Sequence, residues 1–223
     1  MVDLKEFEQK AADLRVLGMK ISIGQDTVYE KYWDEDCRRN IYSASKSFTS
    51  CAVGFAVQEG LIDLDERLMD AFKEDIPNNP DENLKKATVK DLLTMTLGQE
   101  KGFLMGKQRP RMEEQNWVKA SLAIPFVYEP GTHFVYNNVG PYLAGILVQR
   151  RAGCDLLSYL TPRLLKPLGI RKTIWEVDPE GNTFGAGGLF LTVSELHKLG
   201  MFYLQNGCWN GKKLLSKEWI HES

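Results

Sequence analysis

The sequence predicts a mixed α/β (α+β) fold in which helices outnumber strands. Two early stretches alternate apolar and polar residues, as strands do, and several longer apolar stretches end at a glycine, as helices often do. Apolar residues make up 43% of the chain and charged residues 26%, the balance of an ordinary globular protein. A chain of 223 residues can bury a full core, as one large domain or as two closely packed lobes.

The first quarter of the chain predicts a helix, a hairpin and a second helix. Residues 1–15 form an amphipathic stretch rich in charge. Residues 18–24 and 27–33 alternate apolar and polar side chains, and this pattern predicts a β-hairpin. After a polar approach, residues 43–58 predict an apolar helix that a serine caps and Gly60 ends.

Six further helices are expected downstream, each bounded by a capping residue, a glycine or a proline. The capping signals are clearest at Thr88, which is followed by Asp91, and at Thr192 and Ser216. The expected helices cover residues 88–97, 112–122, 139–150, 156–165, 193–204 and 214–220. Loops are expected at 77–80, 99–111 and 181–188, where proline, glycine and polar residues gather.

Composition and charge exclude several classes of function. The net charge of −2 gives no footprint for nucleic acid or for an anionic membrane. No stretch reaches the roughly 18 apolar residues of a transmembrane helix. The first 15 residues lack the apolar core of a signal peptide, so we expect a cytoplasmic protein with four reduced cysteines. The three histidines are not clustered, so we expect no metal site.

Ser43 and Lys46 stand at the start of the second predicted helix. A spacing of three residues on one helical turn places both side chains on the same face. Burial near the helix N-terminus would lower the pKa of the lysine, so that it could take the proton of the serine hydroxyl. Backbone N–H groups at the same helix start could face an oxyanion. The alternative is a capping serine followed by a solvated lysine.

Tyr136 and Asn138 lie between a turn and another apolar helix. A tyrosine can act as a base or proton shuttle when a nearby ammonium lowers its pKa. An asparagine two residues later can orient that lysine with its carbonyl or bind a substrate amide with its NH₂ group. The alternative is a tyrosine that packs its ring and an asparagine that caps the next helix.

Together, Ser43-Ala-Ser-Lys46 and Tyr136-Asn137-Asn138 resemble the motifs of the serine β-lactamase and penicillin-binding protein superfamily. The resemblance is to its class C branch, which includes DD-peptidases and β-lactamase-fold esterases. It implies that Ser43 is acylated, that Tyr136 assists proton transfer, and that a helical lobe over about residues 62–180 accompanies an antiparallel sheet. Similar blocks follow in the family's order at residues 43–64, 89–98, 130–145, 165–175 and 187–211.

Two departures from the family pattern stand out. Met95 and Leu97 occupy positions where many relatives carry His and Ser. The third motif, Lys-Thr-Gly or His-x-Gly, is absent; Lys198-Leu199-Gly200 mimics it but falls within a predicted helix. We therefore expect residues 1–223 to form a single β-lactamase-like domain that lacks its C-terminal strands. The sheet edge left open would favour a homodimer.

Two hypotheses of function remain open from the sequence. In the first, the protein is a serine hydrolase that forms an acyl-enzyme on an ester, a β-lactam or a D-alanyl amide, without metal or organic cofactor. A cytoplasmic location favours an esterase-like role. In the second, it is a retired member whose cleft binds a ligand or partner protein. A nucleotide site at the glycine-rich stretch 181–188 is disfavoured, because the stretch lacks the Gly-Lys-Ser/Thr ending of a phosphate-binding loop.

Overall fold

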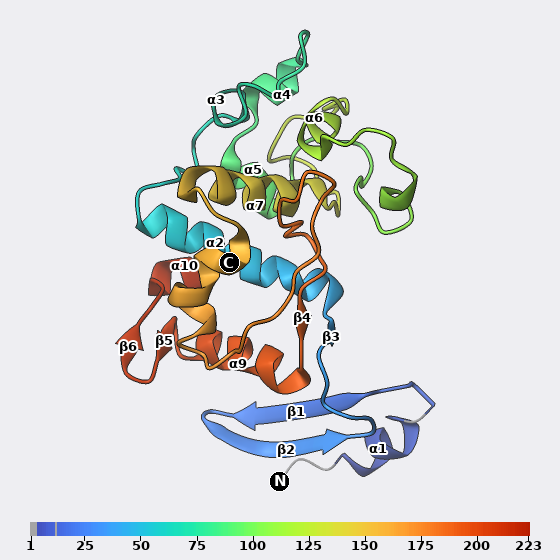
Figure 1. Ribbon diagram of the computed structural model, residues 1–223, viewed down its shortest axis with the longest axis vertical. Coiled ribbons are helices and arrows are strands. Elements are labelled where there is room, and N and C mark those ends of the chain that lie inside the picture. The colour runs from blue at the N-terminus through green and yellow to red at the C-terminus, as the bar shows by residue number, and fades with distance from the viewer. Residues whose placement is uncertain (1–3, 12) are drawn as a thin grey trace.

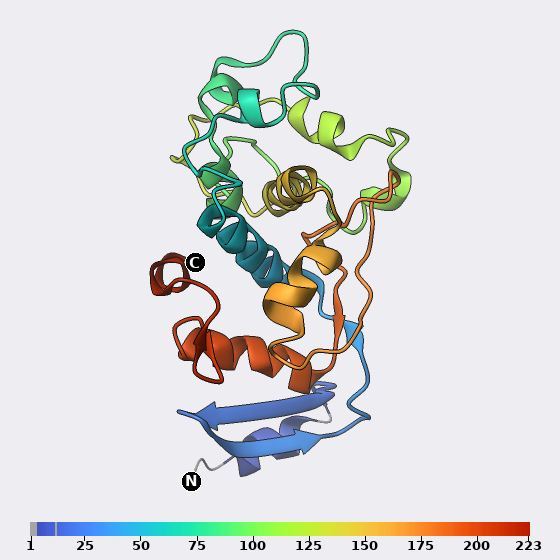
Figure 2. The same ribbon diagram turned by 60° about the vertical axis from the view of Figure 1, so that its left-hand side comes forward.

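The computed structural model describes residues 4–11 and 13–223 and places a β-hairpin at one end of the molecule and a group of helices at the other (Figure 1). The hairpin pairs β1 (Gly18–Ile23) with β2 (Asp26–Tyr32) in antiparallel register. Helix α1 (Lys5–Ala11) lies beside it, and α9 (Val193–Leu204) packs on β1. Figure 2 shows α9 between the hairpin and the rest of the chain.

Two helices form the centre of the molecule. Helix α2 (Ser45–Gln58) crosses it and contacts α7 (Val139–Ala152) and α8 (Leu156–Leu160). Every residue of α7 from Val139 to Gln149 is buried, as expected for a helix that is apolar all round. The segment 161–165 continues α8 as one wider helical turn.

Short helices surround this pair on the side away from the hairpin. They are α3 (Leu68–Ala71), α4 (Glu82–Lys86), α5 (Val89–Thr94) and α6 (Trp117–Leu122). The predicted cap of α5 is confirmed, because Thr88 and Asp91 form a capping box. Helix α5 ends three residues earlier than expected, since Met95 adopts a left-handed conformation with φ of 58°. Helix α6 begins at Trp117 rather than at residue 112, because Asn116 caps it.

Two short strand pairs were not predicted. Strand β3 (Arg39–Asn40) pairs with β4 (Phe190–Leu191), and β5 (Cys208–Trp209) pairs with β6 (Lys212–Lys213). A strand of two residues has no detectable alternation, so only tertiary contacts reveal it. The β3–β4 pair matters most, because it brings the glycine-rich stretch next to the start of α2.

The predicted mixed fold, the hairpin and the caps of α9 and α10 (Lys217–Glu222) are confirmed. The first helix is shorter than expected; residues 1–3 and 12 of that prediction lie outside the described residues. The serine cap of α2 is wrong, because the helix begins after Ala44, whose side chain cannot cap it. No helix among the described residues is long and apolar enough to cross a membrane. The helical lobe over about 62–180 within a single domain of residues 1–223 stays a proposal.

Candidate active site

Ser43 lies in a tight turn between β3 and α2. Residues Tyr42–Ala44 form one turn of 3₁₀ helix, and Tyr42 has a φ of 46°, in the left-handed region. Its N–H donates to Oδ1 of Asn40 at 2.7 Å, and its carbonyl oxygen accepts from the Ser45 hydroxyl at 2.6 Å. The side chains of Asn40 and Ser45 therefore hold this strained backbone in place. The adjacent Ser43 is exposed to solvent.

The ammonium group of Lys46 lies among three oxygen atoms. Its Nζ is 3.3 Å from Oγ of Ser43, 2.7 Å from Oδ1 of Asn138 and 2.5 Å from the carbonyl oxygen of Ala186. Burial lowers the pKa of Lys46, and the nearby charge of Arg109 lowers it further, although Tyr136 acts in the opposite direction. The sequence-based expectation of a lysine with a lowered pKa next to Ser43 therefore has a structural cause.

Tyr136 approaches Ser43 from the segment that precedes α7. Its hydroxyl donates to Oγ of Ser43 at 2.7 Å, and the Lys46 ammonium lies 5.2 Å from the centre of its ring. Burial alone would raise the pKa of Tyr136. The hydrogen bond with Ser43 and the charge of Lys46 outweigh burial, so the pKa falls below its ordinary value. A tyrosine in this state gives up and takes back a proton more readily than a free one.

Both polar groups of the Asn138 side chain form hydrogen bonds within the protein. Its carbonyl accepts from Lys46, and its Nδ2 donates to the carbonyl oxygen of Leu104 at 3.0 Å. Asn138 stands at the N-cap of α7 but makes no capping hydrogen bond, so the capping alternative is wrong. The sequence offered two candidate functions for Asn138, to orient Lys46 or to bind a substrate amide. Its hydrogen bond with Lys46 supports the first.

These side chains border a cleft of about 560 Å³, which is lined by Ser43, Tyr136, Asn138 and residues from two loops. One loop contributes Met105, Gly106 and Arg109, and the other contributes Phe184 and Ala186 to Gly188. The order of the chain predicts that the loop from Lys101 to Arg111 lines the mouth of the cleft, and the position of Arg109 confirms this, although that residue was not singled out. Sequence analysis treated the glycine-rich stretch as an ordinary loop and so missed the Ala186 carbonyl.

The glycine-rich loop is fixed by side chains from other elements. Thr49 of α2 donates to the carbonyl oxygen of Gly185 at 2.8 Å, and the Trp175 indole donates to that of Gly187 at 2.8 Å. Gln149 of α7 accepts from the N–H of Thr183 at 2.8 Å. The loop is therefore a fixed wall that holds the Ala186 carbonyl against Lys46.

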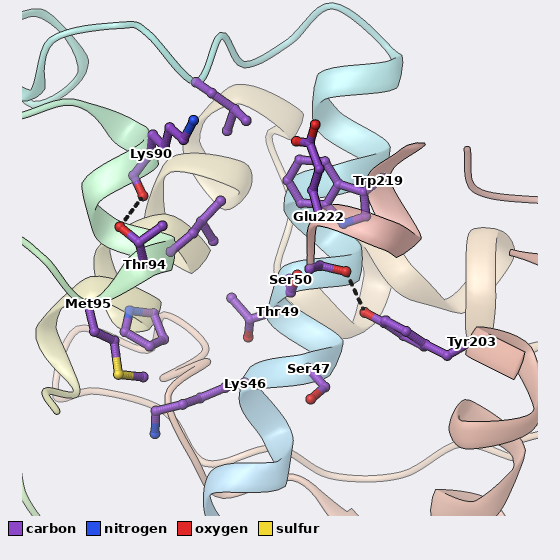
Figure 3. A pocket seen from close by; sticks show the side chains of 14 residues that line it. Lys46, Ser47, Thr49, Ser50, Lys90, Thr94, Met95, Tyr203, Trp219 and Glu222 are labelled. Carbon is purple, nitrogen blue, oxygen red and sulfur yellow. Dashed lines mark hydrogen bonds between the residues drawn. The ribbon is translucent and has the colours of Figure 1, made fainter. Parts of the chain in front are cut away.

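A second cavity of about 280 Å³ lies along α2, between α5 and α10. Figure 3 shows Lys46 near one end of it, with Trp219 and Glu222 at the opposite end. Ser43 and Tyr136 line the first cleft and Lys46 lines this second cavity, so Lys46 lies between the two. Lys198, the mimic of a third motif, lies within α9 and donates to the carbonyl oxygen of Gly169.

Comparison with known proteins identifies the family. The family model described as Beta-lactamase matches residues 5–221. The chain belongs to the β-lactamase family. The predicted resemblance to this superfamily is therefore confirmed, and the Ser-x-x-Lys and Tyr-x-Asn motifs stand at adjoining positions of one cleft, as described above.

Within this family, two curated relatives are fungal enzymes. Monacolin J acid methylbutanoyltransferase of Aspergillus terreus is 31% identical over 157 residues, which cover 61% of this chain and 37% of the relative. Lovastatin esterase of Penicillium rubens is 31% identical over 150 residues, which cover 57% of this chain and 37% of the relative. The matched region therefore spans little more than a third of the length of these relatives.

A solved structure supports the fold. The octameric penicillin-binding protein homologue of Pyrococcus abyssi superposes with a TM-score of 0.77 at 22% identity, over 99% of this chain and 59% of that chain. Almost every element described here therefore has a counterpart in that β-lactamase-like fold. The match leaves about two fifths of that chain without a counterpart here.

Proposed function

We propose that the protein is a serine hydrolase that works through an acyl-enzyme and prefers esters, in the class C-like branch of its family. The observation that carries the proposal is that two groups donate hydrogen bonds to Oγ of Ser43 and, once deprotonated, can act as its proton acceptors: Nζ of Lys46 at 3.3 Å and the Tyr136 hydroxyl at 2.7 Å. Both acceptors have a pKa below the ordinary value, as activation of a serine requires.

The proposed reaction has two steps. Ser43 Oγ attacks the substrate carbonyl while its proton passes to Lys46 and Tyr136, and the proton then goes to the leaving alkoxide as the C–O bond breaks. Water, or a second alcohol, attacks the acyl-enzyme and loses its proton to the same pair, which returns it to Ser43. The backbone N–H of Ser43, in the first turn before α2, would stabilise the oxyanion.

An ester is favoured as the substrate class by the relatives. One relative is named an esterase and another an acyltransferase, and both names describe transfer of an acyl group. β-Lactams and D-alanyl amides react by the same two steps, so they are useful probes even when they are not the natural substrates. We assign Lys46, Tyr136 and Ser43 as catalytic residues and Asn138 as the residue that positions Lys46.

The test is intact-protein mass spectrometry after incubation with a fluorescent penicillin and with an activated ester. We expect a covalent adduct, or a burst of released alcohol, that is lost in Ser43→Ala. Ser47→Ala is the matched control, because Ser47 is an exposed serine of the same helix that does not line the cleft. Lys46→Ala and Tyr136→Phe should slow adduct formation by about 10²–10⁴-fold.

The same experiment can contradict the proposal. If the folded wild-type protein forms no adduct, or if Ser43→Ala forms one at the same rate, Ser43 is not an acylated nucleophile. The cleft would then be better described as a binding site for a ligand or partner protein.

A further inference from the structure

Arg109 lies in the cleft and affects the proposed proton transfer only through its charge, which lowers the pKa of Lys46. Its guanidinium carbon is 4.2 Å from the centre of the Phe184 ring, and the side chain is only 18% exposed. Phe184 is fully buried and makes an edge contact with Trp117 at 5.8 Å. The cation therefore lies on a rigid aromatic base, which fixes the plane of its donors.

Among the described residues, the guanidinium of Arg109 has a single hydrogen-bond acceptor. Of its five N–H groups, one on NH1 donates to Oε1 of Glu176 at 2.7 Å. Nε is buried and has no acceptor among the described residues. A buried charged donor without a partner costs free energy, so such a group in a substrate cleft points to an anion that is bound during function.

Glu176 differs from Arg109 in its exposure to water. Its side chain is 40% exposed, and it stands at the rim of the same cleft. An ion pair with one partner in water contributes little to stability, so exchanging Glu176 for another carboxylate costs little. Of the described residues that line this cleft, Arg109 and Glu176 are the charged ones.

We propose that Arg109 is a specificity-determining residue that binds a carboxylate on the acyl part of the substrate, and that Glu176 is the counter-ion which this carboxylate displaces. The inference rests on the proposed acyl transfer at Ser43. A carboxylate matches the planar fork of arginine and can accept two parallel hydrogen bonds.

The position of Tyr136 indicates that the carboxylate belongs to the acyl part of the substrate rather than to the leaving group. This residue returns the proton to the leaving group and belongs to the segment before α7. Arg109 instead contacts Glu176 and Phe184, which belong to the wall formed by residues 174–190. The substrate would therefore be an ester whose acyl chain carries a second, free carboxylate.

The test compares two esters of equal length, the p-nitrophenyl hemiester of glutaric acid and p-nitrophenyl valerate. We expect Arg109→Met to lower kcat/KM for the hemiester about 10- to 100-fold more than for valerate, the range of a lost charge-assisted hydrogen bond. Any loss common to both esters measures the effect of the Arg109 charge on the pKa of Lys46. Glu176→Gln should raise kcat/KM for the hemiester severalfold, because the competing carboxylate is gone. Arg111→Met, a neighbouring exposed arginine that does not line the cleft, should change neither.

Binding to Ser43→Ala separates this inference from the proposed function. Calorimetric titration of Ser43→Ala with the hemiester should give an affinity that Arg109→Met removes and that valerate does not reach. If the wild type forms no acyl-enzyme but this binding difference is found, the Ser43 mechanism fails and the carboxylate site stands.

Three results would overturn the inference. Arg109→Met could lower kcat/KM for both esters equally, and the arginine would then only support the cleft wall. Ser43→Ala could bind both esters with the same affinity. The preference could also appear only when the carboxylate is moved to the alcohol part, which contradicts the assigned position. Thermal melting of Arg109→Met and Arg109→Lys, compared with wild type, detects a loss of fold.

Discussion

At the scale of single residues, the site depends on the surroundings that set the pKa of one partly buried lysine, Lys46. Lys46 donates to neutral oxygens of Asn138 and Ala186, which hold it in place without adding a charge. Burial therefore remains the dominant influence on its pKa, and it favours the neutral amine that can accept a proton. The ionised form of Tyr136 is the acidic group that opposes this effect.

Tyr136→Phe should lower the pKa of Lys46 further. Interaction with the tyrosine raises that pKa in the wild type, so removing the phenol removes a group that favours the ammonium form. The midpoint of the Lys46 titration should move to lower pH, as measured by NMR of ¹³C-labelled lysine. A midpoint that moved to higher pH would contradict this account of the pair.

At the scale of elements, the start of α2 and the glycine-rich loop are held together by several contacts. The pairing of β3 with β4 brings the two segments side by side, and the N–H of Leu189 donates to the Ser45 hydroxyl at 3.1 Å. Thr49, one turn further along α2, donates to the loop again. The position of the Ala186 carbonyl, and with it that of Lys46, follows from these contacts.

Thr49→Val should destabilise the protein and slow acylation. The change keeps the shape of a fully buried side chain but leaves the Gly185 carbonyl without its donor, which costs about 1–3 kcal/mol of unfolding free energy. Thr49→Ser keeps the hydroxyl and should lose less. Chemical denaturation and the rate of adduct formation at Ser43 provide the two readouts. Equal stability of the Val and Ser variants would show that this hydrogen bond does not hold the loop.

At the scale of the whole molecule, stability depends on close approach of the central helices. Gly140 of α7 lies against α5, and a Cβ atom there would be 2.2 Å from the carbonyl oxygen of Leu92. Gly200 of α9 has open space where its Cβ atom would be. The close packing of α7 on α5 therefore requires a glycine at position 140, whereas position 200 has room for a side chain.

Gly140→Ala should therefore destabilise the protein, and Gly200→Ala should stabilise it. The first forces two helices apart, at a cost of about 1–3 kcal/mol or more. The second removes a flexible residue from an exposed helix interior and should gain about 0.5–1 kcal/mol. Melting temperatures of the two variants measure the difference. A destabilised Gly200→Ala would mean that α9 needs this glycine for a reason other than space.

Much of the fold could be predicted because its signals are local. The hairpin, α7 and the caps at Thr88, Thr192 and Ser216 depend on residues that are close together in the sequence. The β3–β4 pair joins residues about 150 positions apart over two residues each, so periodicity cannot reveal it. The end of α5 at Met95 was also hidden, because that residue takes a positive φ without being a glycine.

Some residues of the candidate site could likewise be predicted from the sequence, and others could not. Ser43, Lys46, Tyr136 and Asn138 belong to short motifs, so their positions could be predicted, and the structure brings the four together. Ala186 contributes a backbone carbonyl, which any residue type could supply, and Arg109 is a single arginine in a polar loop. Neither carries a sequence pattern, so only the folded chain relates them to Lys46.

The three hydrogen-bond partners of Lys46 come from distant parts of the sequence, and this determines when the site can form during synthesis of the chain. Their partners stand at positions 43, 138 and 186, so a growing polypeptide carries the serine long before it carries the last carbonyl. Contacts between distant positions form late in folding. A nascent chain therefore carries Ser43 and Lys46 before the glycine-rich loop that completes their surroundings. Under the proposed mechanism, Ser43 stays an ordinary hydroxyl until the ribosome has delivered that loop.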